Sequence, residues 1–119
     1  MILSNFFRSK ILYVSTGANE ESIYDKVVVG KAVYIYNHIA IINTTSSYTR
    51  FRIGVDVIPV FHLHEEFVSP LVSVLYWTKS PLYVYPDERL QVKIEGATIG
   101  DKFEINVQGY LKVQELINA

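Results

Sequence analysis

The feature that most constrains this chain is a strict alternation of apolar and polar residues in its last third. Apolar residues occupy every second position of 90–95, and again of 102–108. Because successive side chains of a β-strand point to opposite faces, this spacing predicts two strands that each have one face on a core and one in water. The glycine-bounded segment 96–101 between them suits a hairpin or a short loop.

The middle of the chain is also strand-like, but it is apolar on both faces. Residues 31–42 and 48–57 predict two further strands that are separated by the polar turn at 43–47. A strict period of two divides the first of these strands into two faces, Val33, Ile35, Ile39 and Ile41 on one side and Tyr34, Tyr36, His38 and Ile42 on the other.

Turn signals recur every 8–12 residues and separate about eight predicted strands, a spacing typical of antiparallel sandwiches and barrels. The remaining short strands are predicted at 11–14, 23–29, 61–65, 72–77 and 82–85. We expect an all-β chain that forms an antiparallel β-sandwich, and an eight-stranded jelly roll is the preferred form because two packed sheets limit exposed edges.

Residues 11–112 form the predicted sandwich domain. Residues 1–10 begin with an apolar segment, which fits either an N-terminal arm on a neighbouring molecule or the first edge strand of the same domain. Residues 113–119 are predicted to be a C-terminal tail. We expect no membrane interaction, because no apolar stretch approaches the roughly 20 residues that a membrane-spanning helix needs.

Composition removes several classes of function. The net charge of -1 on 119 residues argues against a general nucleic-acid binder, which carries a basic excess. The chain has no cysteine, and neither a nucleophile elbow of the form G-x-S-x-G nor a phosphate-binding glycine loop is present. These absences leave no recognised catalytic motif in the sequence, and we expect no cofactor.

One short segment is typical of a metal site. At a period of two, His62, His64 and Glu66 would share a strand face, and such a set can bind Zn²⁺ or Fe²⁺. Histidine pairs of this kind occur in cupins, but the cupin carboxylate comes further downstream, where Val68 or Ser69 stands. No histidine follows His64 to complete the set. A cupin-like metalloprotein is therefore the least favoured alternative.

Aromatic residues are the second feature, and several of them cluster around one Ser-Pro step. Exposed aromatic side chains can bind sugar rings or anchor a protein interface, and buried ones fill a core. A carbohydrate-binding module is thus an open alternative, with a glycan as its ligand. The candidate interface residues are Phe6, Phe7, Tyr76, Trp77, Tyr83 and Tyr85.

The order of four segments resembles small jelly-roll virion proteins of tailed bacteriophages, of the head-decoration, cement or spike-base type. The segments are V-x-x-G-K-x-V-Y-I (27–35), R-F-R-I-G-V (50–55), S-P-L-Y-V-Y-P-D-E-R-L (80–90) and I-E-G-A-T-I-G-D-K-F-E-I-N-V-Q-G-Y (94–110). The resemblance implies a structural protein that is not an enzyme and that forms a homo-oligomer, most plausibly a trimer. It also implies attachment to other capsid or tail proteins in the virion, after assembly in the host cytoplasm.

Overall fold

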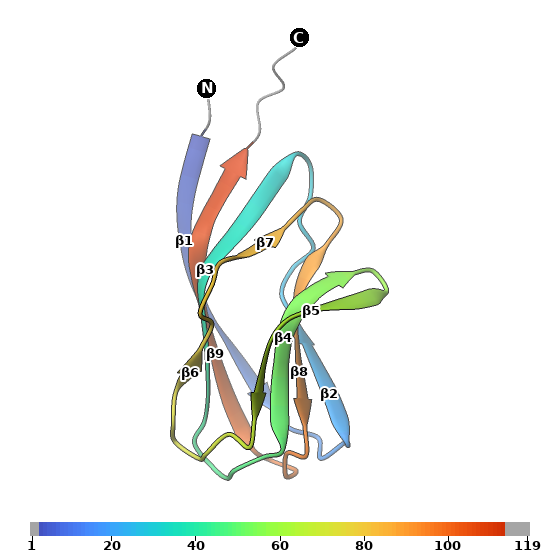
Figure 1. Cartoon of the computed structure of the whole chain (residues 1–119), viewed down its shortest axis with the longest axis vertical. Coiled ribbons are helices and arrows are strands. Elements are labelled where there is room, and N and C mark those ends of the chain that lie inside the picture. The colour runs from blue at the N-terminus through green and yellow to red at the C-terminus, as the bar shows by residue number, and fades with distance from the viewer. Residues whose placement is uncertain (1–2, 114–119) are drawn as a thin grey trace.

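The computed structural model describes residues 3–113, with side chains for residues 6–112, as two antiparallel sheets packed face to face (Figure 1). Sheet A consists of β1 (Leu3–Val14), β9 (Lys102–Val113), β3 (Ala32–Asn43), β6 (Tyr76–Trp77) and β7 (Leu82–Val84). Sheet B consists of β2 (Glu20–Tyr24), β8 (Arg89–Glu95), β4 (Arg50–Val57) and β5 (Val60–Val68). The predicted all-β antiparallel sandwich is confirmed.

Successive strands cross from one sheet to the other, except that β4 and β5 both lie in sheet B and β6 and β7 both lie in sheet A. In sheet A the order is β1-β9-β3, with β6 and β7 both pairing with β3, and in sheet B it is β2-β8-β4-β5. Leu3 pairs with Val113, so the described chain enters and leaves the fold at the same pole (Figure 1). No helix long and apolar enough to cross a membrane occurs in the part of the chain that the structure describes.

Residues 3–10 belong to β1, the edge strand of sheet A, which pairs with β9 along its whole length. Of the two predictions for the N-terminal segment, the structure therefore has the edge strand, and residues 1–2 lie outside the described residues. Val113 ends β9, whereas residues 114–119 of the predicted tail also lie outside them.

The core lies between the sheets and is made by alternate residues of the long strands. Phe51 and Ile53 of β4 meet Phe103 and Ile105 of β9 in a cluster from which water is excluded. Each fully buried side chain of this size contributes roughly 1.5–3 kcal/mol to stability. The predicted inward faces of β4, β8 and β9 are those that the structure buries.

The segment 96–101 does not form a hairpin. β8 pairs with β2 and β4 in sheet B, and β9 pairs with β1 and β3 in sheet A. The connection is the short loop that we also considered, and it crosses from one sheet to the other.

A β-bulge in β3 corrects the predicted faces of this strand. Tyr36 pairs with Gly109 and His38 pairs with Gln108, so Asn37 is the extra residue. Because a bulge reverses the alternation, Tyr34 and Tyr36 share the inner face with Ile39 and Ile41, and Ile35 lies on the outer face. The strict period of two thus fails beyond Tyr36.

Each sheet carries one such bulge next to a glycine of the partner strand. A Cβ atom at Gly109 would overlap the carbonyl oxygen of Ile35, and one at Gly54 would overlap that of His62. The second bulge lies in β5, where Ile53 pairs with Glu65 and Gly54 pairs with Leu63. In both places a glycine gives the bulged strand the space that it needs.

Candidate functional site

The six candidate aromatic residues separate into two groups. Phe6, Trp77, Tyr83 and Tyr85 are exposed, and the Phe6 side chain is 84% accessible. Phe7 and Tyr76 pack against the core instead. The ring of Phe7 lies 5.4 Å from that of Tyr34 and 5.3 Å from that of Tyr36, and the ring of Tyr76 lies 6.1 Å from that of Phe51.

The outer face of sheet A carries a row of large side chains across four strands. In the strand register Phe6 pairs with Tyr110, Tyr110 with Ile35, and Ile35 with Tyr83. The rings of Phe6 and Tyr110 lie 6.1 Å apart. Ile35 is only 3% exposed, although it lies outside the core cluster, because neighbours on the outer face cover it. This part of the outer face is therefore apolar, whereas the solvated face of an antiparallel sheet is usually polar.

A second apolar group, here called the Trp77 patch, lies nearer the opposite pole of the same face and comprises Leu12, Ala40, Ile42 and Trp77. Ala40 pairs with Trp77, and both Leu12 and Ile42 pair with Glu104. Leu12 is 70% exposed and Trp77 is 47% exposed. The neighbouring 71–75 loop, which was predicted to begin a strand, exposes four further apolar side chains, Leu71, Val72, Val74 and Leu75.

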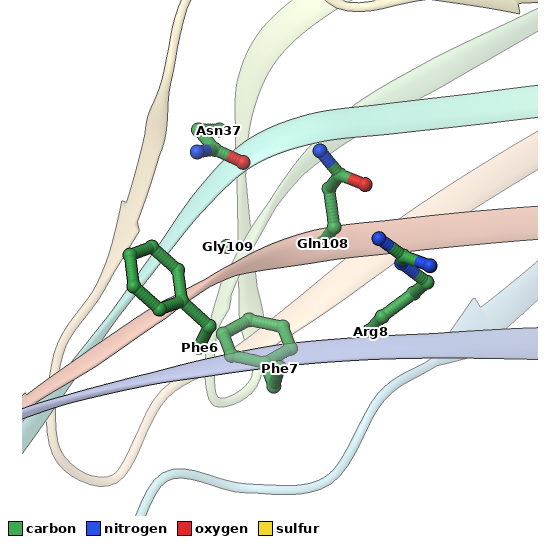
Figure 2. Close-up of a pocket in the computed structure, with 6 residues that line it drawn as sticks. All are labelled: Phe6, Phe7, Arg8, Asn37, Gln108 and Gly109. Atoms are coloured by element: carbon green, nitrogen blue, oxygen red, sulfur yellow. The ribbon is translucent and has the colours of Figure 1, made fainter.

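Between the aromatic row and the Trp77 patch lies a cavity of about 330 Å³, here called the bulge pocket (Figure 2). It is lined by Phe6, Phe7, Arg8, Asn37, Gln108 and Gly109. The β3 bulge turns Asn37 and His38 to the outer face in succession, so the Asn37 amide lies toward Gln108, with Arg8 on the far side of Gln108 (Figure 2). The pocket thus combines an exposed ring with two carboxamides and a guanidinium group.

A larger cavity of about 450 Å³ adjoins the bulge pocket at the edge of β1 and shares Phe6, Phe7 and Arg8 with it. Its other lining residues include Asp25 and Lys26. The carboxylate of Asp25 is engaged, because it accepts hydrogen bonds from the Tyr36 hydroxyl and the Lys26 amide at 2.7 Å and 2.8 Å.

The three candidate metal ligands do not share a face. His62 pairs with Val55 and Glu66 pairs with Arg52, so they lie on opposite faces of sheet B, and His64 is the extra residue of the bulge between them. No group of three or more His, Asp or Glu side chains converges anywhere in the described residues. The prediction that His62, His64 and Glu66 project together is wrong because the bulge reverses the alternation.

His64 instead forms part of a clamp between β5 and the loop that follows β6. Glu65 accepts hydrogen bonds from the backbone amides of Lys79 and Ser80 at 2.7 Å and 3.1 Å. The Nε2 atom of His64 lies 3.3 Å from Ser80 Oγ and 3.5 Å from Glu65 Oε2. In a catalytic triad the carboxylate holds Nδ1 and leaves Nε2 to the serine. Here both groups approach the same nitrogen, so this geometry is that of a loop anchor.

Along β2, β8 and β4 the outer face of sheet B is charged and internally paired, whereas the edge strand β5 exposes Leu63 and Val68 on it. Arg50 donates hydrogen bonds to Glu95, Arg52 donates to Glu20 at 2.7 Å and to Glu95 at 3.4 Å, and Lys93 lies 3.6 Å from Glu20. The hydrogen bonds from Arg50 hold the pKa of Glu95 below its usual value. A face whose charges are paired in this way is suited to water.

A buried carboxylate joins the two sheets at the pole opposite the described termini. Glu21 of β2 is 5% exposed and accepts hydrogen bonds from the Tyr13 hydroxyl of β1 and from Ser15 and Thr16. Burial alone would raise the pKa of Glu21, but these hydrogen bonds outweigh it and the pKa lies below 4.5. Burial and the same carboxylate raise the pKa of Tyr13 to about 12.

Neither the models of protein families nor the curated proteins give a match to this sequence. The resemblance to phage virion proteins therefore stays a prediction. Sequence reasoning found the aromatic part of the exposed surface but missed Arg8, Asn37 and Gln108. Gly109 was the residue that could have indicated the pocket. The alternation of 103, 105 and 107 predicts an apolar side chain at position 109, and a glycine there indicates a bulge or a close approach of another strand.

Proposed function

We propose that this chain is a non-enzymatic structural protein that assembles with copies of itself through the Trp77 patch on the outer face of sheet A. The observation that carries the proposal is the difference between the two outer faces. Sheet B turns paired charges outward, whereas sheet A turns outward the Trp77 patch and an aromatic row. Exposed apolar groups of this kind, rimmed by polar residues, mark interaction sites.

A second copy is the occupant that the fold favours. The outer edge of β1 is open over a strand of 12 residues, and an open edge presents unpaired backbone groups to another strand. In a three-fold ring each contact joins two different surfaces. The hairpin between β4 and β5 supplies such a second surface, because Val57, Ile58 and Val60 are all exposed at its tip. This arrangement fits the homotrimer that the sequence resemblance implies.

The strand order supports the finer proposal of an eight-stranded jelly roll. Rolling one long antiparallel ribbon of eight strands pairs the first with the eighth, the second with the seventh, the third with the sixth and the fourth with the fifth. Here β1 pairs with β9, β2 with β8, β3 with β6 and β7, and β4 with β5. The order matches when β6 and β7 are counted as two pieces of one strand.

On this fold we place the role that the resemblance implies, a decoration, cement or spike component on a phage capsid or tail. The charged face of sheet B would remain toward water, and the apolar face would meet other copies and the shell proteins. Detection of the chain in purified phage particles is the result expected, and its absence from particles of a phage that encodes it would overturn this part of the proposal.

The assembly itself is tested by light scattering coupled to size-exclusion chromatography at micromolar concentration. We expect an oligomer for the natural chain, a monomer for Trp77→Glu, and an unchanged oligomer for Val68→Glu. Val68 is 69% exposed and pairs with Arg50 on the outer face of sheet B, so it is a matched control. A natural chain that is monomeric, or a Trp77→Glu variant that keeps its size, would contradict the proposal.

A carbohydrate-binding module is the second candidate, and the bulge pocket is the observation that favours it. Its ring, amides and guanidinium group are of the kinds that contact sugars.

A further inference from the structure

The geometry points to the bulge pocket as a binding site for a sugar unit that carries a carboxylate, such as a uronic or sialic acid in a glycan chain. This inference goes beyond self-assembly and does not depend on it, because the assembly is proposed through the Trp77 patch, which shares no residue with the bulge pocket. It specifies a ligand class, a position in the fold and a role for each lining side chain.

Phe6 supplies the apolar contact. Its ring is 84% exposed on the outer face of sheet A and lies 6.1 Å from the ring of Tyr110. One face of a pyranose ring presents C–H groups, and the negative face of an aromatic ring attracts them. A phenylalanine left in water beside polar groups loses its unfavourable hydration when a sugar covers it.

Asn37 and Gln108 supply the hydrogen bonds. Each carboxamide offers both donors and an acceptor, which is the combination that adjacent sugar hydroxyls require. Figure 2 shows the two amides, from β3 and β9, arranged around Gly109 with the ring of Phe6 on one side and Arg8 on the other. A flat apolar surface and two bifunctional polar groups therefore face the same volume.

Arg8 specifies the charge of the ligand. Its guanidinium group can hold a carboxylate with two parallel hydrogen bonds. The nearest acidic residue lining the adjoining cavity, Asp25, already accepts bonds from Tyr36 and Lys26. Since no carboxylate among the described residues lines the bulge pocket itself, an anionic sugar fits it better than a neutral or cationic one.

The backbone builds this site in advance. Asn37 is the extra residue of the β3 bulge, and Gly109 lacks the Cβ atom that would overlap the carbonyl oxygen of Ile35. Bulges commonly re-aim a side chain next to a functional site. Because the three strands β1, β9 and β3 hold the four contacting residues, little ordering is needed when the ligand binds.

The volume fits one sugar unit, with room for a second next to it. The bulge pocket of about 330 Å³ lies at the low end of the range for small-molecule sites. The adjoining cavity of about 450 Å³ shares Phe6 and Arg8 with it, so a chain can continue over the edge of β1. We therefore expect an oligosaccharide to bind more tightly than its terminal unit.

The test is calorimetric titration with three probes, a glucuronate-containing tetrasaccharide, sialyllactose and neutral lactose. We expect saturable binding of one or both acidic probes at millimolar concentration, and weaker binding of lactose. Phe6→Ala should remove binding of every probe. Arg8→Gln should weaken the acidic probes about tenfold and leave lactose unchanged, because it removes the bidentate pair alone.

Tyr85→Ala is the matched control, because Tyr85 is also exposed and does not line the pocket. It should bind like the natural chain. The inference fails if no acidic probe saturates, or if Phe6→Ala and Arg8→Gln bind as Tyr85→Ala does. Equal affinity for lactose and for the acidic probes would show that the pocket does not select a carboxylate. A natural chain that is monomeric and binds acidic sugars would contradict the assembly proposal only. A natural chain that is oligomeric, together with a monomeric Trp77→Glu variant that binds no acidic sugar, would contradict this inference only.

Discussion

The outer faces of the two sheets solve the same problem in opposite ways. Each covers a shared core, but sheet B directs Arg50, Arg52 and Glu95 outward in a paired network, whereas sheet A directs Phe6 and Trp77 outward without apolar cover. Paired surface charges contribute little to stability, yet they keep a face soluble. The exposed part of each ring adds little to the stability of the isolated fold, so it is available for contact with another molecule.

The two bulges extend this contrast. The bulge in β5 makes Glu65 and His64 a clamp on the loop at 79–80, and the clamp serves the fold itself. The bulge in β3 has no comparable internal partner and turns Asn37 toward a cavity. The same backbone irregularity thus stabilises one sheet and opens a site on the other.

The largest expected effect comes from filling the space next to each bulge. Gly109→Ala and Gly54→Ala should each lower the free energy of unfolding by about 3 kcal/mol, because the added methyl group meets a backbone carbonyl that cannot move freely. Urea denaturation measures the loss. An unchanged unfolding midpoint for either variant would show that the neighbouring strand can shift to accommodate the added methyl group.

The two glycine variants also separate the faces. In the folded fraction, Gly109→Ala should lose acidic-sugar binding and Gly54→Ala should keep it. Equal sugar affinity in both variants would break the distinction between the two bulges.

Removing the buried link between the sheets should have the next largest effect. Glu21→Gln should cost about 2 kcal/mol at neutral pH, because the amide keeps one acceptor oxygen and turns its NH2 group toward either Ser15 Oγ or the Thr16 N–H, both of which donate to the carboxylate. The loss measured by urea denaturation should exceed that of a surface control such as Glu104→Gln, whose half-exposed carboxylate lies 3.6 Å from Lys10 Nζ. A smaller loss would mean that the two faces are joined mainly by the apolar core.

The same carboxylate gives a pH dependence with a definite sign. The folded-state pKa of Glu21 is lowered, so its contribution is fully present above the ordinary value of 4.5 and is lost as the pH falls through the lowered value. Asp101, whose pKa is also lowered by hydrogen bonds from Ser46 and Thr98 that outweigh its burial, adds to this acid-induced loss. Glu21→Gln should therefore lose less stability than the natural chain on acidification. A larger loss of stability on acidification in Glu21→Gln than in the natural chain would contradict the lowered pKa of Glu21.

The smallest expected effects come from one substitution on the outer face of each sheet. Arg52→Met should cost about 0.5 kcal/mol at low ionic strength, and the cost should vanish in about 1 M NaCl because the ion pairs are screened. Tyr83→Ser on sheet A should change the unfolding free energy by less than about 0.5 kcal/mol at any salt concentration. Thermal unfolding at low and high salt concentration measures the stability of both variants. A salt-dependent change in the stability of Tyr83→Ser would contradict the electrostatic difference between the two faces.

Much of the fold can be predicted from the alternation of apolar and polar residues. The prediction fails where a bulge interrupts that alternation. The inner faces of β4, β8 and β9 are predictable because these strands run without interruption. The faces of β3 and β5 are not, since an extra residue at Asn37 or His64 changes the alternation without a signal in its own type.

The candidate site was less accessible to sequence reasoning than the fold. Phe6 is foreseeable as an exposed aromatic residue near the start of the chain, but Arg8, Asn37 and Gln108 come from three strands whose neighbours are set by the sheet order. The 71–75 loop is apolar enough to predict a strand, yet the structure gives it only turns before Tyr76–Trp77. Its exposed apolar residues are a surface of the kind that the proposed assembly would bury.

The pairing of Leu3 with Val113 gives the molecule a direction. Anything joined to either end of the described fold leaves from one pole, and the connections at 15–19, 44–49 and 96–101 lie at the other (Figure 1). Fluorophores attached at the two ends would therefore report the same height above a surface on which the protein stands. A reporter inserted at the opposite loops would lie farther away along a body 53 Å long, so two labels suffice to measure which way up each copy is mounted.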